Sequence, residues 1–299
     1  MDLRWLDDIL VLLEEKNMTR AAERQNITQP AFSRRIKNFE DWVGETILER
    51  GKNSIRVKAA LKENEIEIRA LLDRVDRLKT LIRNFDPKNI TATVAAHHAP
   101  IHSVLPEMLV YAKTLFPSLR LNLRAGDLDD CVSIFLRGDA DMLLCFEAED
   151  SQPLPFGEAV SCTVCGRDQL IPVIGGALRY QLRSDGSASD QLPAITYPAS
   201  SAFGRMLRSK AKPFGTTAFS KSTVCETAFS TGVKDLVLSG LGVAWLPASM
   251  GYHELERGDL VSLARQFGRV PLRISLYTME RHEMAAALAN AWASKVELR

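Results

Sequence analysis

The sequence predicts an α/β protein made of three successive parts: a small all-α N-terminal unit, a long linker helix and an α/β domain of two lobes. Three observations support this prediction. Leucines at helical spacing open the chain, a heptad repeat without Gly or Pro follows, and the last two-thirds alternate between strand-like and helix-like segments. We place the boundaries of the three parts at residues 1–58, 59–86 and 87–299.

The composition is that of an ordinary soluble chain, with 299 residues, 46% hydrophobic and 25% charged. The N-terminal run MDLRWLDDILVLLEEKNM carries charges throughout and matches neither a signal peptide nor a membrane anchor, so we expect a cytoplasmic protein without a membrane partner. The five cysteines are odd in number and scattered, which indicates reduced thiols. The net charge of +1 identifies no partner. Residues 16–37, however, hold six basic side chains against one acidic, an excess that would attract a phosphate backbone.

The first two helices are expected from local spacing. Leu3, Leu6, Leu10 and Leu13 recur at helical intervals and predict an amphipathic helix over residues 3–15. Thr19 is expected to cap a short second helix with the sequence TRAAERQN. The two alanines of that helix are small enough to let another helix cross closely.

A third helix follows a tight turn. Thr28 is the expected N-cap, which places Gln29 and Pro30 in the first turn, where proline removes no intrahelical hydrogen bond. Ile27, before the cap, is placed to pack on Phe32. One face of this helix gathers its apolar side chains, which are Phe32, Ile36, Phe39 and Val43.

The opposite face of the third helix is polar and basic. It is centred on Arg34, with Lys37 nearby and Ser33 on its flank, whereas Arg35 lies closer to the apolar stripe. Such a face is typical of a helix-turn-helix recognition helix, whose Arg and Gln side chains hydrogen-bond base edges in the major groove. We expect Arg34 to read bases and Arg35 to bind a phosphate or another part of the protein. The alternative is a three-helix packing unit with a solvated basic face.

The run AAERQNITQPAFSRRIKNFEDWVGETILER resembles the N-terminal winged helix-turn-helix of LysR-type transcriptional regulators. In that family a recognition helix of the form T/S-Q-P-A-x-S-R-x-I is followed by L-E-x-x-x-G-x-x-L-F-x-R. The resemblance implies a DNA-binding set in which Gln29, Pro30, Ser33 and Arg34 face the base edges while Thr28, Arg35 and Lys37 lie at phosphates or nearby. It also implies a wing, touching the adjacent minor groove, that contains or neighbours Arg50, Lys52 and Arg56. The chain departs from the family after the wing, where Lys58 and Leu61 replace the usual threonine cap and glycine.

The linker carries a heptad pattern. Its first apolar series is Leu61, Ile68, Val75 and Ile82, and its second is Leu71, Leu78 and Phe85, which only Asn64 breaks. The pattern predicts a continuous helix over residues 59–86 that pairs with a second copy, although a helix packed on its own domain is the alternative. A dimer would suit DNA, because a two-fold protein reads two half-sites. In the resembling family this segment is the helix that dimerises the DNA-binding domains.

The remaining residues alternate between strands and helices. The expected strands are ITATVAA, LRLNLRAG, ADMLLCF, a segment near DQLIP, AITYPAS, VAWLP and PLRISLYTM. The expected helices are LPEMLVYAKTLF, DLDDCVSIFLRG, TVCETAFSTGVKDLVLSGLG and MAAALANAWASKVEL. The alternation predicts a mainly parallel sheet and two lobes joined by crossover strands, with lobe I at residues 87–164 and 269–299 and lobe II at residues 165–268. Ligands would collect in the cleft between them.

The resemblance continues through LRGDADMLLCF and LVLSGLGVAWLP, and it implies a periplasmic-binding-protein-like effector domain that encloses a small inducer. Mapped by position, the implied effector-binding residues are His97, His98, Ala99, Phe146, Ser200, Ser201, Thr223 and Cys225. Strand ends followed by helix N-termini offer free N–H groups, so an anionic effector fits the chemistry. The alternative is that these are ordinary loop residues.

Two further motifs invite other chemistry. His98 and His102 have the i, i+4 spacing of zinc ligands, but Pro100 predicts that His98 precedes the helix, and no cluster completes a ligand set. We therefore expect no metal and no cofactor. Cys162 and Cys165 lie in a strand-like run that points them to opposite faces, so we expect structural thiols rather than a redox pair.

These expectations combine into a LysR-type regulator: a homodimer through the linker and a homotetramer through the effector domains, which binds double-stranded operator DNA under control of a small molecule. The alternative is an oxidant-responsive regulator, because SSAFGRML and GLGVAWLP resemble the hypochlorite-responsive branch, and Cys225, Met206 and Met250 are oxidisable. An enzyme lacks a nucleophile, base and orienter in one site. A solute-binding protein would need a signal peptide and has no use for the first 85 residues.

Overall fold

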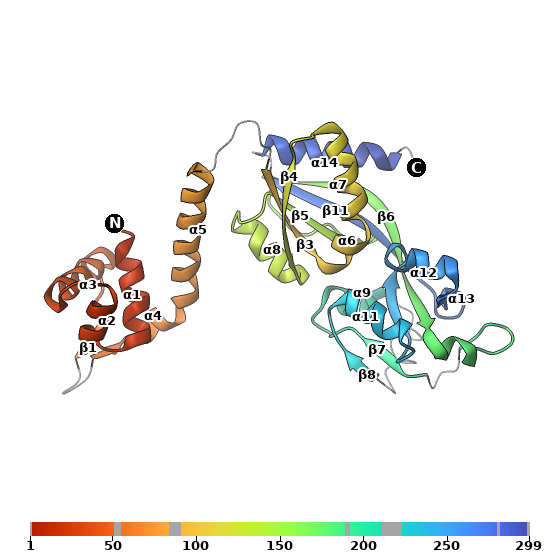
Figure 1. Cartoon of the computed structure of the whole chain (residues 1–299), viewed down its shortest axis with the longest axis horizontal. Helices are drawn as coiled ribbons and strands as arrows, with labels where there is room; N and C mark the ends of the chain where they lie inside the picture. The colour runs from red at the N-terminus through yellow and green to blue at the C-terminus, as the bar shows by residue number, and fades with distance from the viewer. Residues whose placement is uncertain are drawn as a thin grey trace. The chain divides into compact units, whose positions relative to one another are not determined.

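The computed structural model describes residues 2–50, 55–83, 91–188, 192–210, 223–279 and 282–297. The chain divides into two compact units, Met1–Asp86 and Pro87–Arg299, which we call unit 1 and unit 2 and describe separately (Figure 1). Among the described residues, no helix is both long and apolar enough to cross a membrane.

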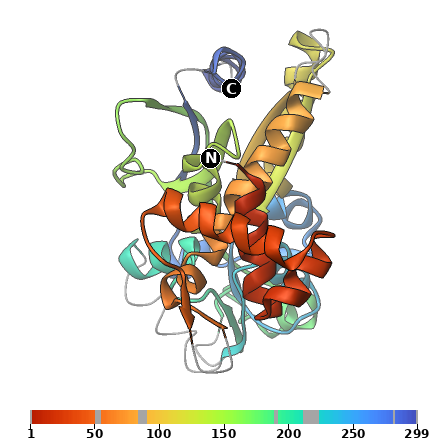
Figure 2. The ribbon, with the colours of Figure 1, turned by 90° about the vertical axis from the view of Figure 1, so that its left-hand side faces the viewer.

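Unit 1 contains a three-helix bundle followed by a hairpin and the linker (Figure 2). Its elements are α1 (Arg4–Glu15), α2 (Met18–Arg24), α3 (Gln29–Val43), β1 (Leu48–Arg50), β2 (Ile55–Val57), α4 (Ala59–Glu63) and α5 (Glu65–Arg83). The side chain of Asn17 caps α2 by accepting hydrogen bonds from the backbone N–H groups of Thr19 and Arg20. The expectation that Thr19 is the cap is therefore wrong, because the extended backbone at Asn17 brings its amide oxygen to those two donors first.

The three helices enclose one apolar core. The predicted stripe of α3 supplies Phe32, Ile36 and Phe39, which are buried, whereas Val43 at the end of the helix is half-exposed. Ile27 packs against the same core, as a hydrophobic staple requires. Asn26 adopts the left-handed conformation in the turn between α2 and α3, which lets the chain reverse within a few residues.

A buried ion pair joins α1 to α3. The carboxylate of Asp8 is fully buried and lies 2.6 Å from Nε of Arg35, whose side chain is mostly buried. Burial raises the pKa of Asp8 to about 6, although the positive charge of Arg35 opposes that shift. Arg35 is expected to bind either a phosphate or another part of the protein, and this contact is of the second kind.

The linker is helical but not continuous. It breaks at Asn64, the C-cap of α4, where the backbone N–H and the side-chain amide both donate to the carbonyl of Ala60. Leu61 and Ile68 pack against the core of unit 1. Leu78 and Ile82 are 56% and 68% exposed. The first half of the heptad pattern thus closes the unit's own core, and the second half lies on the surface.

Unit 2 is built on a seven-stranded sheet. Six strands follow the order β10-β6-β11-β5-β3-β4, and β9 also pairs with β6. Their bounds are β3 (Thr91–His97), β4 (Arg120–Gly126), β5 (Met142–Ala148), β6 (Val160–Gly175), β9 (Ala244–Pro247), β10 (Leu260–Ser262) and β11 (Val270–Met279). Only β4, β3 and β5 run parallel, while every described pairing of β6 and β11 is antiparallel. The expected mainly parallel sheet is therefore mixed, because the crossover strands run back against the parallel core.

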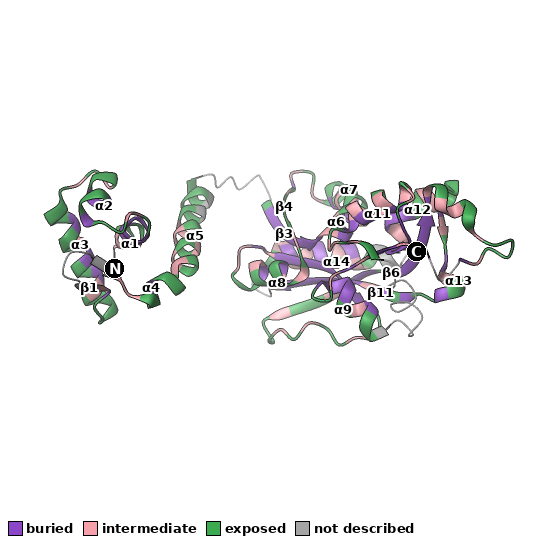
Figure 3. Cartoon of the chain, turned by 90° about the horizontal axis from the view of Figure 1, so that it is seen from below, coloured by how far each residue is buried: buried purple, intermediate pink, exposed green. Residues whose placement is uncertain are grey.

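Helices cover both faces of the parallel part of the sheet, whose strands β3 and β5 are almost wholly buried (Figure 3). We call this part lobe I, with α6 (His98–Ser103), α7 (Leu105–Leu115), α8 (Leu128–Leu136) and α14 (Glu283–Glu297). The indole N–H of Trp292 on α14 donates to the carbonyl of Met108 on α7, 2.8 Å away. On the other face, Phe135 of α8 packs in a cluster with Leu143 and Tyr277.

The rest of unit 2 forms lobe II around the far end of β6. It includes η1 (Gly176–Gln181), β7 (Ala194–Thr196), α9 (Ala202–Lys210), β8 (Thr223–Glu226), α11 (Ser230–Leu238), η3 (Ala248–Gly251), α12 (Tyr252–Arg257) and α13 (Ala264–Phe267). The helix expected to begin at Thr223 begins only at Ser230. Residues 223–226 instead form β8, parallel to β7, because their β-branched composition pairs well with a neighbouring strand.

The buried pair predicts an unusual pH dependence. The folded-state pKa of Asp8, at about 6, lies above the ordinary value of 3.8, so protonation of Asp8 stabilises the folded state. That stabilisation is fully present below about pH 4 and is lost as the pH rises through 6. Relative to Asp8→Asn, wild-type unit 1 should lose about 1–3 kcal/mol of unfolding free energy between pH 4 and pH 7. Native-state hydrogen exchange of α1 and α3 amides in the full chain, corrected for intrinsic rates, measures this. The exposed Asp73→Asn is the control, and a difference of the opposite sign would contradict the assignment.

Candidate functional site

The first candidate site is the outward face of α3. Thr28, Gln29, Pro30, Ser33, Arg34 and Lys37 are all exposed there. Thr28 holds the N-cap position in extended conformation, and its hydroxyl makes no capping hydrogen bond. Within the part of the chain that the structure describes, neither Arg34 nor Lys37 forms an ion pair, so both cations are available to a ligand outside the protein.

Ion pairs within the protein neutralise part of the basic excess of residues 16–37. Arg24 contacts Glu14 at 2.7 Å and Glu15 at 3.0 Å. Arg35 is engaged by Asp8. The positive charge that faces solvent on α3 therefore comes from Arg34 and Lys37, close to the polar side chains of its first turn.

The predicted wing is a two-stranded antiparallel hairpin. Strand β1 pairs with β2 from Leu48 opposite Val57 to Arg50 opposite Ile55. The carboxylate of Glu40 on α3 accepts the backbone N–H groups of Ile47 and Leu48, which fixes the hairpin to the helix. The backbone of Arg50 and Arg56 belongs to these strands, but their side chains and all of Lys52 lie outside the described residues.

The second candidate site lies between the lobes of unit 2, at the end of β3. His97 ends that strand and forms the N-cap of α6, which begins at His98 and includes His102. The expectation that His98 precedes the helix is therefore wrong, because Pro100 stands in the first turn, where its missing N–H is tolerated. His97 is only 3% exposed, and its Nδ1 has no hydrogen-bond partner among the residues that the structure describes. Burial lowers the pKa of His97 to about 4, assisted by the charges of His98 and Arg205.

An aromatic side chain from lobe II packs against lobe I beside His97. The ring of Phe203 on α9 lies 5.1 Å from the ring of His97 and 6.3 Å from that of Phe146. It also contacts Tyr197 edge-on, with centroids 5.3 Å apart. Phe203 is not among the residues expected at this site, although it lies in the run SSAFGRML, two residues beyond Ser201.

The other expected cleft residues are distributed as follows. His98 packs edge-on against Phe229 of lobe II at 5.1 Å, and Ala99 is fully buried beneath them in the shared core. The hydroxyl of Ser201 donates to the carbonyl of Pro198 and accepts from the N–H of Gly204, so it is used to start α9. Ser200 is exposed, and its carbonyl accepts a hydrogen bond from Arg205. Thr223 and Cys225 lie instead on β8, opposite residues of β7.

A salt bridge crosses the cleft. Arg205 of α9 donates through Nη2 to Oδ1 of Asp129 at 2.8 Å and through Nη1 to Oδ2 at 3.0 Å. Asp129 belongs to the first turn of α8 in lobe I. This bidentate pair joins residues 76 positions apart, and local sequence signals could not identify it.

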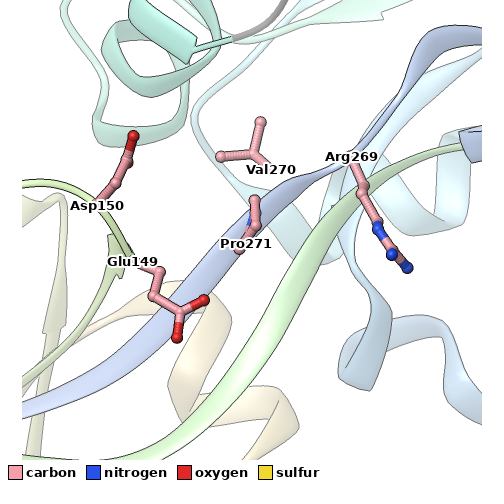
Figure 4. A pocket seen from close by; sticks show the side chains of 5 residues that line it. All are labelled: Glu149, Asp150, Arg269, Val270 and Pro271. Atoms are coloured by element: carbon pink, nitrogen blue, oxygen red, sulfur yellow. The ribbon is translucent and has the colours of Figure 1, made fainter.

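A separate cavity of about 360 Å³ lies where β5 ends and β11 begins. Its lining residues are Glu149, Asp150, Arg269, Val270 and Pro271 (Figure 4). Figure 4 shows the charged side chains pointing apart. Glu149 instead pairs with Arg167 at 2.7 Å, and Arg269 hydrogen-bonds Gln169. These side chains stabilise the strand crossover and do not converge on a common ligand.

The buried cysteines have surroundings that suit a structural role. Burial raises the pKa of the Cys131 thiol to about 11 and that of Cys165 to about 12, and it raises that of Cys145 well above the ordinary value. A reactive thiol needs the opposite shift. Among the described residues, no three His, Cys, Asp or Glu side chains are grouped as metal ligands.

Comparisons with family models agree with this geometry. Residues 3–60 match the model described as bacterial regulatory helix-turn-helix protein, lysR family. Residues 89–295 match the LysR substrate binding domain. The HTH-type transcriptional regulator YjiE of Escherichia coli is 28% identical over 285 residues, covering 93% of this chain and 89% of that protein.

Solved structures show the same architecture. DarR of Vibrio fischeri, determined in complex with DNA, is 26% identical with a TM-score of 0.63, and the match covers 98% of each chain. The full-length hypochlorite-specific regulator HypT of Salmonella typhimurium is 22% identical with a TM-score of 0.59, and 100% of each chain is covered. At that identity the likeness to HypT concerns the fold alone.

Close packing at the start of α9 predicts that a side chain at position 204 destabilises unit 2. A Cβ on Gly204 would collide with the carbonyl oxygen of Pro198, whereas one on Gly157 would meet no atom within 4 Å. Gly204→Ala should therefore displace α9 and lower the stability of unit 2 by about 2 kcal/mol or more, while Gly157→Ala stays within about 0.5 kcal/mol. Thermal unfolding of the two variants in the full chain tests this. Equal melting temperatures would show that α9 does not pack so closely.

Proposed function

This chain belongs to the family of LysR-type transcriptional regulators, and we propose that residues 1–58 bind operator DNA, residues 59–86 dimerise and residues 87–299 bind a small effector. It is a DNA-binding regulator with an effector-binding domain, and the family is one of regulators and not of enzymes. A cytoplasmic location suits a protein that must reach promoter DNA.

The exposed face of α3 carries the proposal for DNA recognition. Its apolar stripe is buried in the bundle and the wing is fixed to it, so the helix can present a rigid row of polar side chains. Arg34 can bridge the acceptors of a guanine and Gln29 can pair with an adenine. Pro30 and Ser33 would lie against the same base edges. Thr28, Lys37 and the wing residues Arg50, Lys52 and Arg56 would hold backbone phosphates or reach the adjacent minor groove.

Arg35 is assigned a supporting role. Its ion pair with the fully buried Asp8 occupies the guanidinium inside the bundle. It would therefore act on DNA binding by fixing the angle between α1 and α3, although it stands next to Arg34 in the sequence.

Self-association is proposed through the exposed half of α5. Leu78 and Ile82 expose apolar surface at heptad spacing, and a second copy of α5 would cover it. A dimer so formed presents two recognition helices to a partly palindromic site. Further association of the effector-binding domains would give the homotetramer.

The effector is proposed to bind between the lobes, near His97, His98, Ala99, Phe146, Ser200 and Ser201, with Thr223 and Cys225 farther out on β8. It would favour one arrangement of the lobes and thereby change how the DNA-binding units are spaced. Oxidation is not part of the proposal. Burial disfavours thiolates at Cys131, Cys145 and Cys165, and Met250 is buried. The other two candidates, Cys225 and Met206, are partly buried against the core of unit 2.

Arg34→Ala tests DNA recognition. Loss of a bidentate guanine contact should cost about 1–3 kcal/mol of operator affinity at fixed salt and relax the preference at one base position. Fluorescence anisotropy with operator and scrambled duplexes measures both effects. Arg265→Ala, at an exposed position on α13, is the control and should bind as wild type. If Arg34→Ala kept full affinity and preference, α3 would not read bases through this residue.

Leu78→Asp combined with Ile82→Asp tests the dimerisation segment. Two charges on the exposed stripe should disrupt pairing of α5 and lower the oligomeric state of the full chain in sedimentation velocity, without unfolding unit 1. Ile68→Asp should instead destabilise unit 1, because Ile68 packs on its core. Asp73→Ala on the same helix is the control. An unchanged oligomer with the double substitution would exclude this half of α5 as the interface.

A further inference from the structure

We propose that Asp129 and Arg205 form a latch that holds the two lobes closed over Phe203, and that the ligand that opens it is a small carboxylate or other oxyanion that replaces the Asp129 carboxylate on Arg205. This inference rests on the proposed effector function of the cleft. It names the arginine that would bind the anionic effector already expected and adds a mechanism by which the cleft opens.

The geometry of the pair is that of a clamp. The two guanidinium nitrogens of Arg205 face the two carboxylate oxygens of Asp129 at 2.8 and 3.0 Å, which is the parallel arrangement preferred by Arg and carboxylate. One partner belongs to α8 in lobe I and the other to α9 in lobe II. The bond therefore spans the cleft directly and breaks if the lobes separate.

The first turns of α9, which carry Arg205, are held firmly in place. Ser201 caps the start of α9, and the helix backbone at Gly204 packs against the carbonyl of Pro198. Phe203, two residues before Arg205, is 1% exposed and packs on His97 and Phe146. Movement of α9 would thus withdraw the Phe203 ring and release Arg205 in one step.

The latch contributes little free energy, so a ligand can open it. The side chains of Arg205 and Asp129 are 45% and 74% exposed, so solvent screens the pair and its contribution is small. A ligand can replace a solvent-exposed carboxylate at little cost, whereas a buried pair such as that of Asp8 and Arg35 would resist replacement.

The groups around Arg205 favour an anionic ligand. The guanidinium of Arg205 also donates to the carbonyl of Ser200, so its described partners are all oxygen acceptors. His97, whose ring packs on Phe203, holds a buried Nδ1 that has no hydrogen-bond partner within the described part of the chain. An oxyanion that displaces Asp129 and the Phe203 ring would satisfy the arginine and give that nitrogen a partner. A neutral or cationic ligand would leave Arg205 paired with Asp129.

The latch is tested by hydrogen exchange on the full chain without added ligand. Asp129→Asn, Arg205→Gln and the double variant should each speed exchange in peptides from α6 and α9 about two- to fivefold, as loss of an exposed ion pair allows. The double variant should be no faster than either single one, because all three remove the same contact. Asp130→Asn, on the neighbouring exposed carboxylate of α8, is the control and should match wild type. Exchange at wild-type rates in Asp129→Asn would overturn the latch.

The ligand class is tested with acetate and sulfate as probes, at constant ionic strength set with chloride. Apparent dissociation constants from melting-temperature titrations should be about two- to fivefold lower in Asp129→Asn than in wild type, because a competitor has been removed. Arg205→Gln should lose the response. If Arg205→Gln bound the probes as wild type does, the anion assignment would be wrong even with the latch intact.

Operator footprints separate this inference from the proposed function. Asp129→Asn should shift the footprint toward the form that saturating acetate or sulfate produces in wild type. If Asp129→Asn speeds exchange and tightens anion binding while the footprint never changes, the latch stands and the effector-controlled function of the cleft fails.

Discussion

The antiparallel ladder between β6 and β11 is the constraint on which the geometry of unit 2 depends. It runs from Val270 opposite Leu170 to Met279 opposite Val160, with one irregularity beside Ile274. The far end of β6 continues beyond β11 to pair with β9 and β10. Because one strand serves both lobes, the lobes stay joined by this ladder even when the cleft between them opens. This connection keeps the C-terminal end of β3 in lobe I close to the start of α9 in lobe II.

Charge is used differently at the two candidate sites. In the helical bundle of unit 1, the buried pair of Asp8 and Arg35 fixes two helices and leaves Arg34 facing outward, so a structural and a recognition arginine stand side by side. In unit 2, Asp129 and Arg205 meet in solvent and pair only while the lobes are closed. Burial shields the first pair from solvent and from competing ligands, and exposure makes the second exchangeable.

The apolar core of unit 2 extends across the cleft and is not confined to either lobe. Phe146 of lobe I, Phe203 of lobe II and Trp245 of β9 belong to one buried cluster. A ligand that enters between the lobes must displace apolar contacts as well as a salt bridge. The same continuity links closure of the lobes to the strands that connect them.

The sequence by itself determined the features that depend on near neighbours. The helix from Gln29, its tolerance of Pro30, its buried stripe and the strands around the parallel core all follow from periodicity and capping, which act over a few residues. Local signals also misled: they placed the cap at Thr19 rather than Asn17, extended one helix back to Thr223 and ran the linker through Asn64. Each of these was decided by a competing hydrogen bond or strand partner.

Only the tertiary structure decided which residues meet across the fold. The pairing of Asp129 with Arg205, the position of Phe203 against His97 and the antiparallel course of β6 and β11 join segments far apart in the chain. It likewise divided the heptad pattern into a half that closes unit 1 and a half that remains exposed. Composition and spacing carry no signal for such contacts, because they depend on how whole elements pack and not on the residues that adjoin them.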